Sequence, residues 1–100
     1  MNLAELTHAF FEPLLNETFR VRLGTQDAPD LRLIDVSVIS DPIPDVTNRH
    51  GFSLIFRGPP NVFLPQATYH FANDRAGELE FTIVPIGPDR DGLRYQAIFN

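Results

Sequence analysis

Apolar residues occupy every second position in four segments of the second half of the chain. The alternating residues are Phe52, Leu54 and Phe56; Tyr69 and Phe71; Leu79, Phe81 and Ile83; and Tyr95, Ala97 and Phe99. Successive side chains of a β-strand point to opposite faces, so the alternation predicts strands with one buried, aromatic-rich face. We expect these strands at residues 52–57, 67–73, 78–86 and 93–99.

A further strand is predicted at residues 18–24, where Phe19, Val21 and Leu23 alternate with arginines. Residues 24–30 then contain Gly, Pro and two Asp, a composition that is typical of a turn. The pattern therefore predicts a polar connection before the next strand.

The strand predicted at residues 31–40 changes the phase of its alternation. Leu31 and Leu33 share one face, whereas Val36 and Val38 lie on the other. A phase shift of one residue is what a β-bulge produces, and a bulge bends the strand. The alternative is a strand covered on both faces, with a helix on one side. We favour the bulge.

The first segment of the chain has helical periodicity. Its apolar stripe comprises Leu3, Leu6, Phe10 and Leu14. Asn2, followed three residues later by Glu5, resembles a capping box at a helix start. Pro13 lacks an amide proton and its ring clashes with the preceding turn, so it ends or kinks the helix. We therefore predict a helix at about residues 3–12.

These elements predict a single, mainly β domain over residues 1–100. Most of the expected connections have the length of hairpin turns, which favours an antiparallel six-stranded meander. Closure removes unpaired strand edges, so we expect the meander to curl into a small barrel or a strongly bent sheet. The one N-terminal α-helix would plug an end of this sheet or cover an open edge.

Composition disfavours several classes of function. The chain has no Cys, which removes disulfides and thiolate sites, and its net charge of −5 disfavours nucleic acids and anionic membranes as partners. No segment approaches the roughly 20 apolar residues of a membrane helix. A secretory signal has basic residues ahead of its apolar segment, and residues 1–15 have none in that position. We therefore expect a cytoplasmic protein without a cofactor.

Three potential metal ligands lie on one face of the predicted helix. Glu5, His8 and Glu12 have this spacing, and an E-x-x-H pair is half of a carboxylate-bridged metal motif. The sequence lacks the matching pair on a second helix. The polar face of a surface helix explains the same spacing, and we favour that interpretation.

A second candidate is the Pro-containing loop 41–51, which carries Asp41, Asp45 and His50. Carboxylates and an imidazole bind divalent metals and perform acid–base chemistry. Asp before Pro is also ordinary turn chemistry, and nothing in the spacing fixes the geometry of the three side chains. We favour the structural interpretation of this loop.

The remaining polar motifs favour surface roles. Residues 89–92 (D-R-D-G) resemble the start of an EF-hand loop without its distal Glu, so we expect a hairpin turn. The arginines expected on the outer face are Arg20, Arg22, Arg57 and Arg94. We expect such arginines to pair across strands with Glu78 and Glu80, and His70 to face outward. Neither a G-x-S-x-G motif nor a phosphate loop occurs, and we predict no catalytic site.

One connection is unusually apolar. Residues 62–64 are three apolar residues between two prolines, within the segment 59–66. They either cover the mouth of the sheet or form an exposed contact for a partner. The residues predicted to bind a partner protein are Pro60, Val62, Phe63 and Leu64, with Ile43 and Val46 of loop 41–51 as a second contact.

Five strings of residues carry a family resemblance. They are T-F-R-V-R (18–22), F-S-L-I-F-R-G-P (52–59), L-P-Q-A-T-Y (64–69), G-E-L-E-F-T-I-V-P-I-G-P (77–88) and R-Y-Q-A-I-F-N (94–100). Together they resemble a family of small uncharacterised bacterial domains of about this length. Members of that family often occur near genes for phage-tail-collar-type fibre proteins, so the resemblance implies an accessory or structural role with such fibres. It implies no catalytic residues.

We therefore expect a non-enzymatic protein-interaction or accessory module, associated with phage-tail-like fibre proteins or their assembly. One alternative is a small-molecule-binding β-barrel, although a six-stranded barrel with nine Phe favours an interior filled by side chains. The second alternative is a metal-assisted enzyme that uses the loop 41–51.

Overall fold

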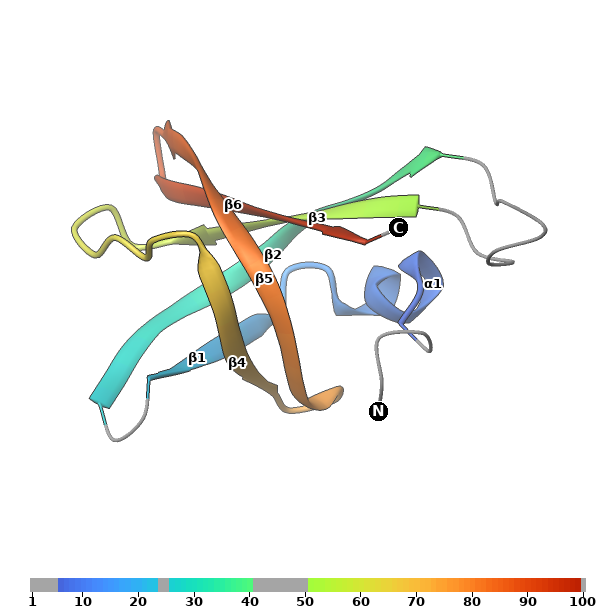
Figure 1. The fold of residues 1–100 in the computed structure, drawn as a ribbon, viewed down its shortest axis with the longest axis horizontal. Helices are drawn as coiled ribbons and strands as arrows, with labels where there is room; N and C mark the ends of the chain where they lie inside the picture. The colour runs from blue at the N-terminus through green and yellow to red at the C-terminus, as the bar shows by residue number, and fades with distance from the viewer. Residues whose placement is uncertain (1–5, 24–25, 41–50, 100) are drawn as a thin grey trace.

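The computed structural model describes residues 6–23, 26–40 and 51–99. Figure 1 shows a short helix at one end of a strongly curled sheet. The elements are α1 (His8–Phe11), a 3₁₀ turn (Glu12–Leu14), β1 (Thr18–Leu23), β2 (Gln26–Ser40), β3 (Gly51–Gly58), β4 (Ala67–Asn73), β5 (Gly77–Asp89) and β6 (Gly92–Phe99).

All strand pairs are antiparallel, and the strand order is β1-β2-β3-β6-β5-β4, with β4 paired back to β1. The curled sheet therefore forms a ring. This confirms the prediction of a mainly β, antiparallel six-stranded fold that bends on itself and carries one N-terminal helix.

The order of the strands corrects the expected meander. β1 to β3 follow one another around the ring, and so do β4 to β6, but β4 lies beside β1 and not beside β3. The connection 59–66 must therefore cross one end of the ring. Leu64 stabilises this crossing, because its side chain is buried in the core and the burial of a Leu contributes about 1.5–3 kcal/mol.

The start of β2 corrects the turn that was predicted at residues 24–30. β2 begins at Gln26, and its first residues pair with the end of β1, where Leu23 lies opposite Gln26. The register of this pair shifts between Arg20 and Arg22. Pro29 falls in the resulting bulge, where no ladder hydrogen bond is required of it, so a proline is tolerated inside the strand.

The bulge predicted in the strand at residues 31–40 is confirmed. The register between β2 and β3 shifts between Leu33 and Asp35, which leaves Ile34 as the extra residue. On its other edge, the backbone of Leu33 bonds to the helix exit. Its carbonyl accepts from Asn16 N–H (2.7 Å), and its N–H donates to the Glu17 carbonyl (3.1 Å). The bulge therefore marks the point where β2 leaves β1.

The helix is shorter than predicted. α1 begins at His8, and the side chain of Thr7 caps it by accepting a hydrogen bond from Phe10 N–H (3.2 Å). Its start is therefore a threonine cap, whereas the expected capping residues Asn2 and Glu5 lie outside the described residues. As predicted, Pro13 follows the end of the α-helix, which tightens into the 3₁₀ turn. Within the described ranges, no helix has the length and hydropathy needed to cross a lipid bilayer.

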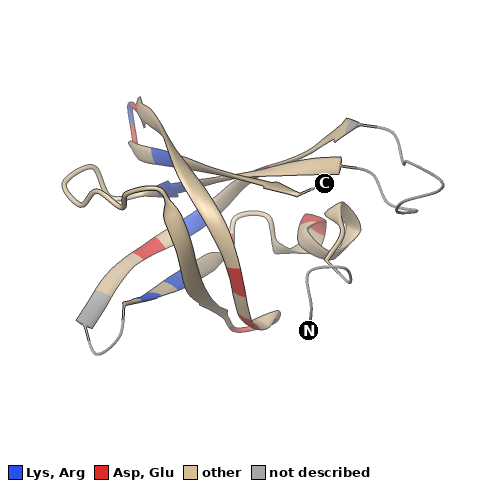
Figure 2. Ribbon diagram, in the orientation of Figure 1, with Lys and Arg blue, Asp and Glu red and all other residues tan. Residues whose placement is uncertain are grey.

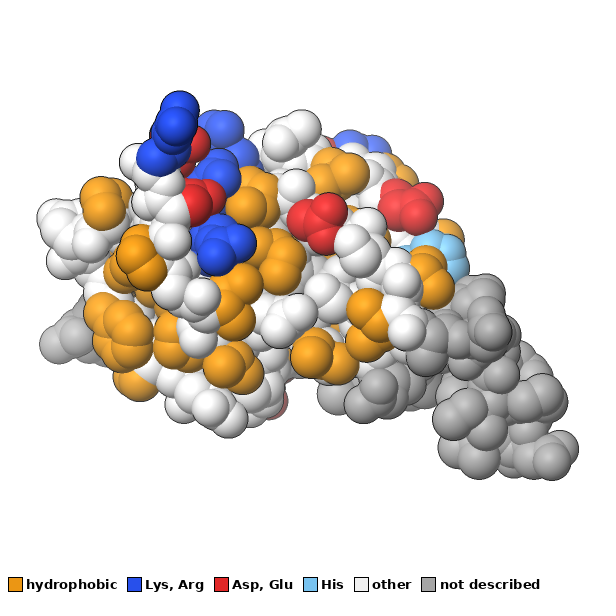
Figure 3. Space-filling view, turned by 90° about the horizontal axis from the view of Figure 1, so that it is seen from above, with side chains coloured by type: hydrophobic (Ala, Val, Ile, Leu, Met, Phe, Trp, Pro, Cys, Tyr) orange, Lys and Arg blue, Asp and Glu red, His pale blue; other side chains and the backbone are white. Residues whose placement is uncertain are grey.

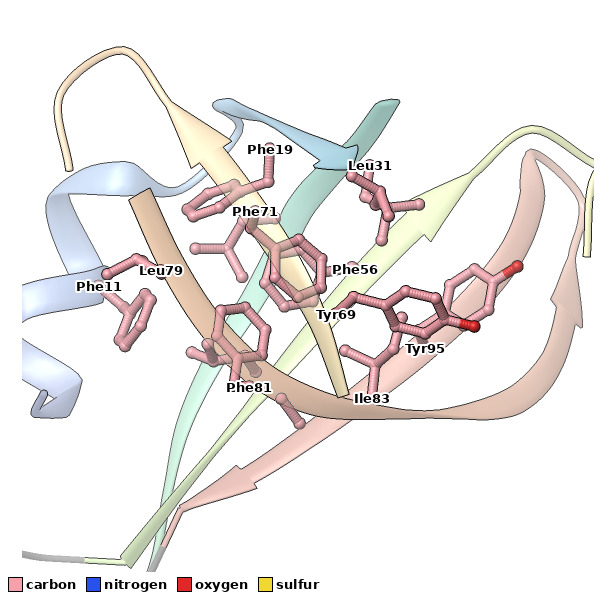
Figure 4. Close-up of a cluster of buried hydrophobic side chains, with 14 of the residues drawn as sticks. Phe11, Phe19, Leu31, Phe56, Tyr69, Phe71, Leu79, Phe81, Ile83 and Tyr95 are labelled. Carbon is pink, nitrogen blue, oxygen red and sulfur yellow. The ribbon is translucent and has the colours of Figure 1, made fainter. Parts of the chain in front are cut away.

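Side chains from all six strands fill the ring, and every alternating residue predicted to be buried in the last four strands is buried (Figure 4). Phe71 and Phe81 stack with ring centroids 4.2 Å apart, and Phe52 and Phe99 stack at 4.7 Å. Phe11 of α1 packs against Phe52 and Phe99 at 5.9 and 5.7 Å. The helix therefore plugs one end of the ring, as expected, but it does so with Phe11, while the expected Phe10 is only partly buried.

The helix exit is fixed to the turn between β4 and β5. The buried Asn73 donates from Nδ2 to the Thr18 carbonyl (3.0 Å). Its Oδ1 accepts from the N–H groups of Arg75 and Ala76. Arg75 in turn pairs with Glu17 at 2.6 Å. This network holds the plugged end of the ring in place.

Candidate partner-binding loop

The connection 59–66 crosses the end of the ring opposite α1 (Figure 1). Its four predicted partner-binding residues separate into two groups. Pro60, Val62 and Phe63 are exposed, and Phe63 is the most exposed large apolar side chain among the described residues, at 62%. Leu64 points the other way and is buried. The loop therefore both closes the ring and displays apolar side chains outside it.

Two tyrosines of the ring hold the backbone of this loop. The Oη of Tyr95 accepts a hydrogen bond from Leu64 N–H (3.1 Å) and donates to the Val62 carbonyl (3.4 Å). The Oη of Tyr69 donates to the Pro65 carbonyl (2.7 Å). Burial raises the pKa of Tyr69 above its usual value, which keeps the hydroxyl protonated and able to donate.

The start of the loop is fixed by close packing around two glycines, Gly58 and Gly92, where no side chain would fit. A Cβ at Gly58 would lie 2.6 Å from Cδ2 of Leu31, and a Cβ at Gly92 would collide with the carbonyl oxygen of Gly58. A turn follows, in which Val62 N–H donates to the Pro59 carbonyl (3.5 Å). The loop thus leaves the sheet at a defined point, and Phe63 stands on a backbone that is bonded on both sides.

A row of arginines crosses the outer face of the sheet beside the loop. Arg32 of β2 lies directly opposite Arg57 of β3, and Arg57 lies directly opposite Arg94 of β6. Figure 2 shows these blue positions on three neighbouring strands. Like charges in directly opposed positions destabilise a sheet, so this row requires compensation.

Asp89 compensates the central arginine. Arg57 Nε donates to both oxygens of Asp89 (3.2 and 3.0 Å), and its Nη2 donates to Oδ2 at 2.5 Å. These hydrogen bonds lower the pKa of Asp89 to about 2 and raise that of Arg57. Oδ1 of Asp89 also accepts from the N–H groups of Asp91 and Gly92, so the D-R-D-G string forms the predicted hairpin turn.

A surface groove of about 400 Å³ lies beside Arg32 and Arg57, two members of this row. Arg32, Arg57, Asp30 and Asp91 supply its charged lining, and Pro59 at the start of the loop forms part of its wall. Most of the arginine visible in the space-filling view gathers toward the same end of the molecule as the loop (Figure 3). Pro59 therefore joins the groove to the start of the loop, whereas the exposed residues Pro60, Val62 and Phe63 do not line the groove.

The candidate metal ligands are not brought together where the structure describes them. Asp41, Asp45 and His50 lie outside the described residues, as do Glu5 and the predicted contacts Ile43 and Val46. The ring of His8 packs edge-on against Phe52, at 6.4 Å between centroids, and Glu12 is exposed. Within residues 6–23, 26–40 and 51–99, no group of three or more potential metal ligands occurs.

The other predicted surface residues pair partly as expected. Arg22 pairs with Glu78 (3.6 Å), which agrees with the prediction. Glu80 pairs with His70 (3.3 Å) and not with an arginine, because the register places His70 directly opposite it. Arg20 pairs with Asp74 (3.0 Å). The four arginines expected together thus fall into two groups on different parts of the ring.

Sequence reasoning missed two contributions to this surface. Tyr69 and Tyr95 were assigned to the core alone, although a buried tyrosine hydroxyl usually needs a hydrogen-bond partner and so signals a polar contact. Arg32 was not singled out, because its position opposite Arg57 depends on the pairing register of β2 and β3.

The whole described fold falls within one family model, whose description is "Domain of unknown function (DUF6916)" and which matches residues 6–99. The chain belongs to the DUF6916 family. The expected resemblance to an uncharacterised family is therefore confirmed, whereas the association with fibre genes stays a prediction. No curated protein and no solved structure matches this DUF6916 chain.

Proposed function

We propose that this DUF6916 domain is a non-enzymatic protein-interaction module whose partner binds the loop 59–66. The observation that carries the proposal is the 62% exposure of Phe63 on a loop whose neighbouring backbone is bonded to Tyr95 and Tyr69. Exposed aromatic side chains are frequent anchors of protein interfaces. A loop already held in place loses less conformational entropy on binding than a free one.

The packing of the interior supports this function over the small-molecule alternative. The aromatic rings of Phe56, Phe71 and Phe81 stack on one another through the middle of the ring, at centroid distances of 4.2–6.0 Å. Side chains thus occupy the space that a ligand between the strands would need. The metal alternative depends on Asp41, Asp45 and His50, outside the described residues, and metal analysis of the purified protein tests it separately.

The resemblance implies a phage-tail-collar-type fibre protein as the partner to test first, in an accessory or assembly role. This identity is part of the proposal, together with a cytoplasmic location. The identity of the partner is a separate question from the binding role of the loop, because a different partner could bind the same residues.

A binding experiment with matched variants tests the proposal. The fibre protein encoded nearest the gene would be purified and titrated with the wild-type domain, with Phe63→Asp and with Ile98→Asp. Ile98 is a suitable control because it is 56% exposed but lies on β6, away from the loop. We expect Phe63→Asp to weaken binding at least about 30-fold, as for an interface anchor, and Ile98→Asp to change it less than about threefold.

Two outcomes contradict different parts of the proposal. If the wild-type domain does not bind the fibre protein, the partner identity is wrong. If it binds and Phe63→Asp binds equally well, the loop is not the contact. Urea unfolding of both variants provides the folding control, since surface substitutions usually change stability by no more than about 0.5 kcal/mol.

A further inference from the structure

β5 and β6 separate from each other beyond their shared hairpin. Their pairing ends at Val84 and Gln96. Beyond that point, residues 77–83 of β5 pair with β4, and residues 97–99 of β6 pair with β3. Figure 1 shows the two strands diverging from the hairpin. Within the described part of the chain, each strand therefore has one edge with no strand beside it.

A proline in β5 shows which backbone groups face this gap. In an antiparallel pair, alternate residues direct both their N–H and their C=O toward the same neighbouring strand. Pro85 has no N–H to donate to β6, so it occupies a position directed away from that strand. The next pair, Val84 and Gln96, is then directed inward between the two strands. Two residues further along each strand, Thr82 and Ile98 direct their N–H and C=O groups into the gap.

A groove of about 220 Å³ lies on the outer face at this gap. Its lining residues come from both sides of the gap, and they are Thr68, Glu80, Phe81, Thr82, Ile98 and Phe99. Phe81 and Phe99 are almost fully buried and pack on Phe11 of α1, at 6.4 and 5.7 Å between ring centroids. Side chains thus fill the space beneath the groove, and the two strand edges border it.

The chemistry of the groove suits an extended polypeptide. N–H and C=O groups on a strand edge are completed by the backbone of an added strand. Ile98 is 56% exposed and offers an apolar contact beside that strand. Among the described lining residues, Glu80 alone is charged, and its side chain is 62% exposed beside His70. A basic side chain is therefore the charged group that complements the groove.

We propose that an extended, basic segment of another protein binds in this groove as an added strand. Its backbone bonds to the edges at Thr82 and Ile98, and a Lys or Arg side chain faces Glu80. The net charge of −5 disfavours a second copy of this chain as the occupant, since two acidic molecules repel each other. The inference goes beyond the proposed function, because no residue of the loop 59–66 lines this groove. The segment is different from the one that contacts Phe63.

Hydrogen exchange of the ¹⁵N-labelled full chain tests whether the two edges are free. We expect the amides of Thr82 and Ile98 to exchange at least about tenfold faster than those of Ile83 and Ala97, which are directed toward β4 and β3. NMR spectra at several protein concentrations measure the rates. Protection of Thr82 and Ile98 without a ligand would overturn the inference. Protection that rises with concentration would assign the edges to a second copy, and constant protection would assign them to this chain itself.

Titration with a short peptide then tests the ligand. The probe is acetyl-T-V-K-V-T-amide, and two matched peptides carry Glu in place of Lys or methyl groups on the amide nitrogens of both Val. We expect the Lys peptide to give a saturable shift of the Thr82 and Ile98 amides and to slow their exchange. The Glu peptide should bind at least about threefold more weakly, because its charge has the sign of Glu80. The methylated peptide should bind at least about fivefold more weakly, because it lacks two donors.

Variants locate the effect on β5. Glu80→Gln is expected to weaken binding of the Lys peptide about threefold. Glu78→Gln is the matched control, because Glu78 lies two residues away on the same strand, pairs with Arg22 and does not line the groove. Its affinity for the peptide should equal that of the wild type.

Four results of the titrations would overturn the inference. They are no saturable shift, equal binding of the Lys and Glu peptides, equal binding of the methylated peptide, and equal losses in Glu80→Gln and Glu78→Gln. Phe63→Asp should bind the Lys peptide as tightly as the wild type does, since Phe63 does not line the groove. The failure of this inference and the failure of the proposed function are therefore distinguishable.

Discussion

The two ends of the strand ring are closed in different ways. At one end, Phe11 of the helix is fully buried against Phe52 and Phe99, and its contacts there are apolar. At the other end, Leu64 is buried, but the hydroxyl of Tyr95 also bonds to the backbone of the loop. The same loop leaves Phe63 outside. The helix end is thus closed by apolar packing alone. At the loop end, packing is combined with hydrogen bonds that hold the loop backbone and leave Phe63 exposed.

The difference shows how a small β domain can carry a surface loop without leaving it free. An apolar plug needs only volume and shape, so a phenylalanine is sufficient at the helix end. A loop that must hold one orientation needs directional bonds, and the tyrosine hydroxyls supply them. The Arg57–Asp89 pair strengthens this second end, because it fixes the β5–β6 hairpin beside the start of the loop.

Removing the apolar plug should have the largest effect on stability. Phe11→Ala leaves a cavity at the helix end, and we expect it to lower the free energy of unfolding by about 3–5 kcal/mol. Urea unfolding followed by circular dichroism measures the change. The control is Phe10→Ala, because Phe10 is only partly buried and packs on the ring of Phe11 at 5.1 Å. Equal losses for the two variants would show that the plug is not Phe11.

Removing the tyrosine hydroxyl at the loop end should cost less overall and act locally. Tyr95→Phe keeps the packing but leaves Leu64 N–H without its acceptor, and we expect a loss of about 1–2 kcal/mol in unfolding free energy. Hydrogen exchange of the Leu64 amide should accelerate more than that of amides in β3. Tyr69→Phe should cost less, because its acceptor belongs to the exposed Pro65. Uniform acceleration across the ring would contradict a positioning role for Tyr95.

The ion pair beside the loop should make this end sensitive to acid. The pKa of Asp89 is about 2 in the folded chain, below the usual value of about 4, so the unfolded state binds more protons between these values. The contribution of Asp89 to stability is therefore present above about pH 4 and lost as the pH falls toward 2.

Urea unfolding of the wild type and Asp89→Asn between pH 2 and pH 6 measures this contribution. We expect the difference between the two proteins to be largest near pH 6 and to shrink toward pH 2. Asp74→Asn, in the more exposed pair with Arg20, should have a smaller effect at pH 6. A difference between wild type and Asp89→Asn that does not change with pH would show that the pair contributes nothing through its charge.

The alternation of apolar residues was sufficient to predict the core. Phe52, Leu54 and Phe56 are all buried, because a strand has a fixed period of two and one of its faces must be covered. The bulge after Leu33 was predicted for the same reason, since a change of phase in the pattern requires an extra residue. Such features depend on local geometry, and local geometry is read directly from neighbouring residues.

The candidate site was only partly predictable. The apolar residues of the connection 59–66 predicted a contact there, but its sequence does not separate the buried Leu64 from the exposed Phe63. That separation depends on Tyr95, which is 31 residues away along the chain from Leu64. The predicted start of β2 lies too far along the chain, because the residues around a proline in a bulge resemble those around a proline in a turn.

The sequence by itself determined which residues face inward, that the strands are antiparallel, and that a proline ends the helix. These properties follow from the periods of strands and helices and from the covalent chemistry of proline. Only the tertiary structure decided that β4 lies beside β1, that Arg32, Arg57 and Arg94 form one row, and that the row borders the loop. The physical reason is that strand order and register depend on packing between distant segments, and no local pattern records them.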